Sequence, residues 1–565
     1  MPALMTAAEK SSAPRRAAWI AALLIAVVAI ALHVRFLNHA GGLWRDEVSL
    51  VNLASHSTLA DFAHDSFPVL MPLTVHGWMQ AGFGKTDFGL RCLGALIGGG
   101  IVLALLANGW ATRRSPPLIG LALFALNSTA ILYGDSLRAY GLGSLGIVLT
   151  ATAAWLLLQK PTLPRTAIFA LTAILSVQAL FQNAVLVAAI CAGAFAVCWR
   201  QKLFSSALKV FLGGLLAAIS LLPYLPNLLT VPANAAGLRT GFQPDVIHAN
   251  LAAALGFPLP QYFFVWALLA VITIGCGIFL LTKNGRARHS VRAASDSPTR
   301  RARSVAPYLT AADSTDAQLF AAVTLLVALV LFGGFLWFAA LPTQPWYFLP
   351  LMALAAACFD TGLPSLPDRF RAAGFGLVLA TALAATAFAW RDVDIRLSNV
   401  DVLAQRLAAV TAPEDFVIVN PWFCGIGFER YFKSAAPWTT LPPLSDHSGH
   451  RYDLVHEQMK NPDAIAPVLE KISATLRAGK RVWVIGWLEI PASGATPPAP
   501  MPPPPLKHTG WSDMPYAITW AGQTAHFLRQ HARTFEQVKL PPLGAVNPSE
   551  DLNLFIAEGV RSPGE

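Results

Sequence analysis

Charged residues are scarce in this 565-residue chain: Asp, Glu, Lys and Arg make up 13% of it, against 55% hydrophobic residues. The mean hydropathy is +0.52. A soluble globular protein usually carries about 25% charged residues, so this composition excludes that class. It indicates a polytopic membrane protein, whose apolar helices face lipid.

Three further features are missing, and each absence excludes a class of site or fold. The six cysteines form no C-x-x-C pair, so neither a disulfide framework nor a thiolate metal site is expected. Gly425 and Gly427 follow an apolar run, but Arg430 stands where a dinucleotide-binding fingerprint has its third glycine. We therefore expect a plain strand-to-helix turn there. No internal repeat is visible, which disfavours a transporter built from two similar halves.

Eleven apolar segments have about the length that a membrane-crossing helix needs. They are residues 17–36, 91–111, 117–133, 139–158, 166–182, 184–199, 207–227, 259–282, 318–340, 345–360 and 372–390. No small-residue cleavage site clearly follows the first of them, so we expect a retained anchor rather than a signal peptide.

Basic residues orient these segments. If the N-terminus is cytoplasmic, the inner segments carry nineteen Lys and Arg residues and the outer loops up to residue 345 carry six. The positive-inside rule favours this orientation. The net charge of +10 is therefore a mark of topology, and no nucleic-acid partner is expected. The predicted location is a bacterial inner (plasma) membrane.

The composition changes after Trp390, which predicts two domains: a membrane domain over 1–390 and a soluble domain over 391–565. In the second, a helical run near 398–410 leads into a strand-like run at 416–420. Another helical run, near 465–478, leads into a strand-like run at 481–485. Helix, turn and buried strand occurring twice predict an α/β layer. An odd number of spans places this domain outside the cytoplasm.

Two adjacent carboxylates, Asp46 and Glu47, lie in the first outer loop next to a membrane span. Such groups are costly to bury, and a positioned carboxylate can act as a general base towards a hydroxyl group. The alternative is a solvated loop with acids at a helix N-terminus. Neighbouring residues point in different directions, so one of the pair could face a cavity while the other makes structural contacts.

The second outer loop contains Asp135, Arg138 and Tyr140. An arginine there can bind a phosphate through two parallel hydrogen bonds, or it can be an interfacial anchor. In the first outer loop, His64 and Asp65 could add a polar wall to the same site.

Five short motifs resemble those of membrane glycosyltransferases with the GT-C fold, and in particular the protein mannosyltransferase and aminoarabinose transferase superfamily. In chain order they are Trp44-Arg45-Asp46-Glu47, Phe67-Pro68-Val69-Leu70 with Asp87-Phe88-Gly89-Leu90-Arg91, Asp135-Ser136-Leu137-Arg138-Ala139-Tyr140, Leu222-Pro223-Tyr224-Leu225-Pro226, and Trp346-Tyr347-Phe348-Leu349-Pro350. Gln344-Pro345-Trp346 departs from the last motif, which usually has an arginine before its tyrosine.

The resemblance covers about residues 17–390. It implies an all-helical membrane bundle and an enzyme that moves a sugar from a polyprenyl-phosphate donor to an extracytoplasmic glycan, lipid or protein. Asp46 is expected to be the base and Glu47 its alternate. Substrate binding is assigned to Arg45, His64, Asp65, Asp135, Arg138, Tyr140 and Tyr347.

Topology independently favours a lipid-linked donor. Nucleotide sugars are kept in the cytoplasm, whereas the charged loops are predicted to lie outside. The rival functions are a transporter or flippase of lipid-linked sugars and a non-catalytic assembly protein. No cofactor is assigned and a divalent metal stays open. Five metal-type side chains follow one another in what we expect to be a surface loop: Asp446, His447, His450, Asp453 and His456.

Overall fold

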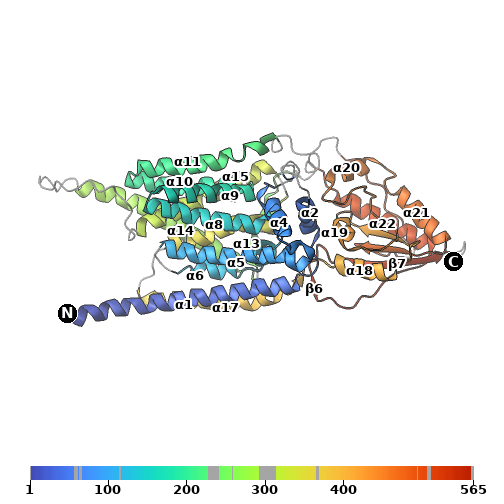
Figure 1. Ribbon diagram of the computed structural model, residues 1–565, viewed down its shortest axis with the longest axis horizontal. Coiled ribbons are helices and arrows are strands. Elements are labelled where there is room, and N and C mark those ends of the chain that lie inside the picture. The colour runs from blue at the N-terminus through green and yellow to red at the C-terminus, as the bar shows by residue number, and fades with distance from the viewer. Residues whose placement is uncertain are drawn as a thin grey trace.

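In the computed structural model, parallel and antiparallel helices lie side by side and a sheet-containing part lies at one end of them (Figure 1). The structure describes residues 2–55, 62, 67–112, 116–226, 241–257, 259–291, 314–340, 342–363, 368–492, 494–504 and 511–561. Within these residues, eight helices are long and apolar enough to cross a membrane. The protein is therefore a multi-pass membrane protein.

Helices occur at all eleven predicted positions. The long ones are α1 (Pro2–His39), α5 (Asp87–Thr112), α8 (Ala139–Gln159), α10 (Asn183–Gln201), α11 (Phe204–Ile219), α14 (Tyr262–Val291), α15 (Ser314–Ala339) and α17 (Asp368–Asp392). Helix α11 itself has 16 residues, and together with the 3-10 turn η3 (Leu222–Tyr224) it forms an apolar span of 21 residues, Phe204–Tyr224. Helix α9 (Leu163–Ala179) is a shorter apolar helix of 17 residues. One more helix, α13 (Pro244–Gly256), precedes α14.

Two predicted spans are not single regular helices. Residues 117–133 form α6 (Leu118–Gly120), the π-helical turn η2 (Leu121–Ala125) and α7 (Ser128–Gly134). Residues 345–360 form the 3-10 turn η5 (Pro345–Phe348) and α16 (Leu349–Gly362). Every residue of η2 and of α16 is buried. Irregular backbone is tolerated at membrane depth only where protein covers it, and η2 satisfies that condition. The turn η5 is partly buried, with Phe348 as its buried residue.

The segment between α1 and α5, predicted to lie outside the cytoplasm and called the first outer loop on that basis, forms short helices rather than a further span. Helix α2 (Arg45–Ala54), helix α4 (Leu70–Gln80) and the turn η1 (Phe83–Lys85) precede α5. Figure 1 shows α2 and α4 at the end of the bundle, between it and the sheet-containing part. Both are too short to cross a bilayer, with 10 and 11 residues.

The C-terminal part is an α/β domain. Its main sheet has the order β3-β2-β4-β7-β5, with β2 parallel to β3 and β4, and β7 antiparallel to β4 and β5. The strands are β2 (Phe416–Asn420), β3 (Trp438–Thr440), β4 (Val482–Gly486), β5 (Ala532–Gln537) and β7 (Asn553–Val560). Strands β1 (Ile395–Arg396) and β6 (Ala545–Val546) form a separate pair.

Five helices accompany these strands: α18 (Val400–Val410), α19 (Cys424–Tyr431), α20 (Tyr452–Lys460), α21 (Ala466–Arg477) and α22 (Met514–His531). The strands β2 and β4 are buried at every residue, so the apolar runs predicted there are the centre of the sheet. Helix α19 starts four residues after β2 ends, which is the predicted strand-to-helix turn. The bundle and this domain have separate hydrophobic cores.

Polar contacts join the domain to the bundle. Asp87, the first residue of α5, accepts hydrogen bonds from Arg430 Nη2 at 2.7 Å and from Tyr431 Oη at 2.7 Å. The backbone N–H of Leu43 donates to the same tyrosine oxygen at 2.6 Å. Asn52 on α2 donates to the carbonyl of Ser448 at 2.9 Å. The first outer loop is thus held between the two cores.

Candidate functional site

Glu47 is buried in the first turn of α2 and holds that turn in place. Its side chain is 0% exposed, and Oε2 accepts a hydrogen bond from Arg91 Nη2 at 2.8 Å and from the backbone N–H of Trp44 at 3.2 Å. Oε1 accepts from the N–H of Leu137 at 3.0 Å. Burial raises the pKa of Glu47, although the charge of Arg91 opposes this rise. The residue therefore ties α2 to α5 and to the second outer loop.

Asp46, its neighbour, points instead to a cluster of cations and donors. Oδ1 lies 2.9 Å from His450 Nε2, and Oδ2 lies 3.9 Å from Arg138 Nε. Arg45 Nε is 3.8 Å from Oδ1. The side chain is 18% exposed. Burial by itself raises the pKa of Asp46, but Arg138, His450 and Arg45 outweigh it and hold the pKa well below its usual value. The carboxylate is therefore ionised at neutral pH.

A chain of aromatic rings begins at Arg138. Its guanidinium carbon lies 4.6 Å from the centre of the Phe67 ring, and a second nitrogen donates to the carbonyl of Asp46 at 3.3 Å. Phe67 meets Tyr140 edge-on at 5.8 Å, and Tyr140 stacks on Tyr347 at 5.7 Å. Four predicted site residues, Asp46, Arg138, Tyr140 and Tyr347, are thus gathered in one place.

Arg45 lies at the junction with the C-terminal domain. Its Nη1 and its backbone N–H both donate to Glu550 Oε1 at 3.0 Å. The guanidinium also covers the ring of Phe423 at 4.4 Å. Glu550 is almost fully buried, so this pair is shielded from solvent. Arg45, predicted to bind substrate, makes its main contacts with the docked domain and adds a weaker one to Asp46.

Asp135 differs from its expected position. Its carboxylate Oδ2 lies 2.7 Å from His33 Nδ1 of α1, and both side chains are buried. The sequence analysis assigned Asp135 to substrate binding, whereas the structure pairs it with a histidine of another helix. Asp135 is the C-cap of α7, which contacts α1 and α5, and Arg138 is the N-cap of α8 three residues later. His64 and Asp65 lie outside the described residues.

His450 also contacts Asp46, and the sequence analysis did not assign it to this site. It was weighed only as one of several metal-type side chains in a loop, yet it reaches Asp46 from 404 positions away in the chain. Its neighbours do not share that role: Arg451 pairs with both Asp446 and Asp453. No group of three His, Cys, Asp or Glu side chains that could hold a metal occurs within the described ranges.

No family model matches the sequence, and no curated protein matches it. Solved structures that are similar include the Archaeoglobus fulgidus oligosaccharyltransferase in its apo form, at 13% identity over 82% of this chain and 69% of that chain, with a TM-score of 0.42. Another is AglB of the same organism in complex with an inhibitory peptide and a dolichol-phosphate, at 15% identity over 82% and 69%, with a TM-score of 0.42.

A third similar structure is ArnT from Cupriavidus metallidurans bound to undecaprenyl phosphate, at 12% identity over 83% of this chain and 92% of that chain, with a TM-score of 0.46. Both kinds of neighbour are GT-C fold glycosyltransferases, the group that the sequence motifs resemble. Because every one of these TM-scores is below 0.5, we argue the function from this chain's own residues.

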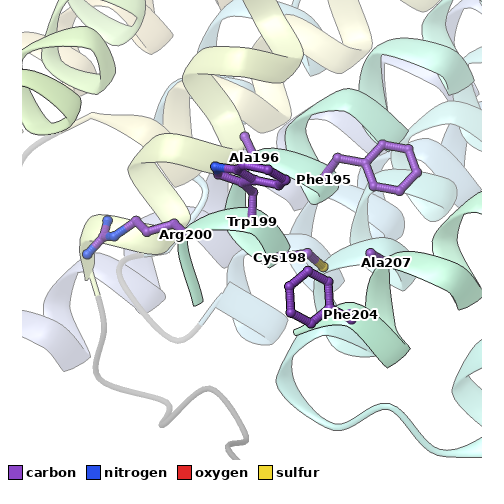
Figure 2. A pocket seen from close by; sticks show the side chains of 7 residues that line it. All are labelled: Phe195, Ala196, Cys198, Trp199, Arg200, Phe204 and Ala207. Atoms are coloured by element: carbon purple, nitrogen blue, oxygen red, sulfur yellow. The ribbon is translucent and has the colours of Figure 1, made fainter. Parts of the chain in front are cut away.

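An apolar pocket of about 500 Å³ lies elsewhere, at the turn between α10 and α11. Figure 2 shows the side chains that line it: Phe195, Ala196, Cys198, Trp199, Arg200, Phe204 and Ala207. The start of α10 is near the charged site, since Gln182 donates to the carbonyl of Tyr347 at 2.8 Å. The 19 residues of α10 then lead away over about 28 Å at 1.5 Å per residue. The pocket and the charged site are separate.

Proposed function

We propose that this protein is a membrane glycosyltransferase that moves a sugar from a polyprenyl-phosphate donor to a glycan, lipid or protein acceptor. One observation carries the proposal: Asp46 of the first outer loop and Arg138 of the second lie 3.9 Å apart at the end of the bundle, beside two stacked tyrosines. A base, a phosphate-binding cation and aromatic walls are the groups that such a transfer needs.

In this proposal, Arg138 binds the donor phosphate through its planar guanidinium. Asp46 accepts the proton of the acceptor hydroxyl while that oxygen bonds to the sugar carbon. The bond from that carbon to the phosphate oxygen breaks, and the electron pair leaves with the phosphate. The leaving phosphate is already ionised at neutral pH, so no general acid is required.

The charges around Asp46 also make the basicity of its carboxylate depend on whether the donor phosphate is bound. With Arg138 and His450 beside it, the carboxylate is a weak base because its ionised form is stabilised. A phosphate bound to Arg138 adds negative charge close to Asp46 and so raises the basicity of the carboxylate. Proton removal is then favoured only when the donor is in place.

Membrane topology supports a lipid-linked donor. The site lies at the end of the bundle where the C-terminal domain docks, and the count of basic residues predicts that this end faces away from the cytoplasm. The proposed location is the inner membrane of a bacterium, with the site and the domain outside. A donor attached to a membrane lipid can reach that side, whereas a cytoplasmic nucleotide sugar cannot.

The test is release of polyprenyl phosphate from a labelled lipid-sugar pool by the purified protein. Asp46→Asn keeps the size of the side chain but removes its basicity, and loss of a general base typically costs about 10²–10⁴ in rate. Arg138→Lys keeps the charge but loses the two-pronged geometry, so its turnover should also drop while the protein still folds. Asp245→Asn, an exposed acid at the start of α13, is the matched control and should match the wild type.

The result also separates the enzyme from its rivals. A flippase moves the donor across vesicle membranes without cleaving it, and an assembly protein does neither. Intact donor after prolonged incubation with the wild-type protein would therefore overturn the proposal. Wild-type turnover in both Asp46→Asn and Arg138→Lys would show that these residues are not the base and the phosphate-binding cation.

A further inference from the structure

A histidine of the C-terminal domain touches the proposed base. His450 lies in the loop between β3 and α20, and its Nε2 is 2.9 Å from Asp46 Oδ1. An ionised carboxylate can only accept hydrogen bonds, so Nε2 must carry a proton and donate it. The contact therefore specifies the tautomer of the ring: His450 Nε2–H points at Oδ1.

The ring is held in that orientation by its own domain. His450 stacks on Tyr452 at 5.9 Å and meets Trp422 edge-on at 6.2 Å. Trp422 is buried and donates to Asp513 Oδ2 at 2.7 Å, so its ring position is set by a hydrogen bond. Two packed rings limit rotation of the imidazole, which makes it a rigid donor rather than a mobile one.

The loop that carries His450 is braced on both sides. Arg451, the next residue, binds Asp453 with Nε at 2.9 Å and Nη2 at 2.6 Å, and its Nη1 binds Asp446. The N–H of Ser448 donates to Asp446 Oδ1 at 2.8 Å. The position of His450 within its domain is thus determined by contacts inside that domain.

We propose that His450 is a positioning residue for the transfer reaction: it donates to Oδ1 of Asp46 and thereby directs Oδ2, on the Arg138 side, toward the acceptor hydroxyl. The proposal rests on the proposed function. It assigns a part of the site to the C-terminal domain, whose docking completes the site. Without the N–H of His450 on Oδ1, the carboxylate can rotate and pair more fully with Arg45, and the acceptor hydroxyl loses its aligned base.

Two conservative variants separate this role from simple packing. Glutamine can place an amide N–H near the position of Nε2, whereas asparagine reaches only the position of Nδ1. His450→Asn should lower kcat by about 10- to 100-fold, the value expected for losing one hydrogen bond to a charged group. His450→Gln should restore most of that loss. The KM for the donor should stay the same in both, since Arg138 is untouched.

Asn52→Ala is the matched control for docking. The substitution removes the hydrogen bond from Asn52 to Ser448, which lies in the loop that carries His450. It leaves the contact between His450 and Asp46 in place. Its kcat should stay close to that of the wild type. If kcat in Asn52→Ala falls as far as in His450→Asn, the effect is one of docking and the positioning role is refuted.

A double-mutant cycle tests whether His450 acts through Asp46. In the Asp46→Asn background, His450→Asn should cause no further decrease in kcat. An equal further decrease would mean that His450 acts independently of Asp46, and would overturn the proposal. So would a His450→Gln variant as impaired as His450→Asn, because a ring needed only for packing is not rescued by an amide.

The contact itself can be tested without turnover. In the full-length protein labelled with ¹⁵N-histidine, the resonances that disappear in His450→Asn should show the Nε2–H tautomer. An Nδ1–H tautomer would refute the inference even in an active enzyme. Absence of donor cleavage by the wild-type protein would instead refute the proposed function, so the two failures are distinguishable.

Discussion

Glu47→Gln should destabilise the protein, whereas Asp46→Asn should inactivate it without unfolding it. The two side chains are adjacent and chemically alike, but the structure gives them different surroundings. Glu47 is 0% exposed and pairs with Arg91, which is 3% exposed. Asp46 is partly exposed and lies among several cations and donors. Replacing the carboxylate by an amide therefore breaks a buried ion pair at Glu47, whereas at Asp46 it removes the basic group of the proposed reaction.

The expected loss of folding free energy in Glu47→Gln follows from the geometry of the Glu47–Arg91 pair. At 2.8 Å and an effective dielectric constant of about 20, the two charges attract by about 6 kcal/mol before desolvation is subtracted. Breaking a buried pair from one side typically costs about 3–5 kcal/mol because the other charge stays buried. Glutamine can still accept from the N–H of Leu137, so we expect a cost near the lower value, about 3 kcal/mol.

The assay is the apparent Tm of the purified full-length chain in detergent, measured beside donor cleavage. Glu47→Gln should melt at a lower temperature and retain cleavage at temperatures where it is folded. Asp46→Asn should melt close to the wild type and lose cleavage. A stable but inactive Glu47→Gln would show that Glu47 takes part in the chemistry, and the assignment of the base within the pair would have to be reversed.

Two further predictions concern topology and pH. An external thiol reagent should label Lys433→Cys, exposed in the C-terminal domain, but not Lys160→Cys, exposed in the predicted cytoplasmic turn after α8; the opposite pattern would refute the outward orientation. Burial raises the pKa of Asp415, but hydrogen bonds from Ala412 and Arg481 lower it overall. Its contribution to stability is therefore present above the unfolded value of about 3.9 and is lost as the pH falls through the lower folded value. Asp415→Asn should lower the apparent Tm at pH 7, and a difference that persists unchanged below about pH 2 would contradict this sign.

Much of the fold could be predicted from local patterns. Apolar segments long enough to cross a bilayer predicted the membrane helices at their positions, and the runs at 416–420 and 481–485 predicted the two central strands of the sheet. These signals are local because a helix or a buried strand needs a periodic or continuous apolar sequence. The irregular segment 118–134 was missed, since burial by neighbouring helices is what permits it. The turn 345–348, which is only partly buried, was missed as well.

The motifs also predicted which loops bear the charged residues. Asp46, Arg138, Tyr140 and Tyr347 were selected from three separate stretches, and the structure brings them together. Their proposed roles remain predictions. The order of the spans predicted that these loops lie at the same end of the bundle. Each span crosses the membrane once, so every second loop lies on the same side.

The sequence motifs ranked Asp46 ahead of Glu47 as the expected base, but only the tertiary structure shows how the surroundings of the two acids differ. A helix turns by about 100° per residue, so Glu47 enters the core and Asp46 faces the domain, but the direction of the core depends on how α2 packs. Asp135 meets His33, and His450 meets Asp46, across 102 and 404 positions of the chain. Such pairings depend on the docking of whole elements, which local periodicity does not encode. Composition and pattern thus determined a membrane bundle with an α/β domain, and only the packing of the two decided that Glu47 is buried against Arg91 while Asp46 lies beside Arg138 and His450.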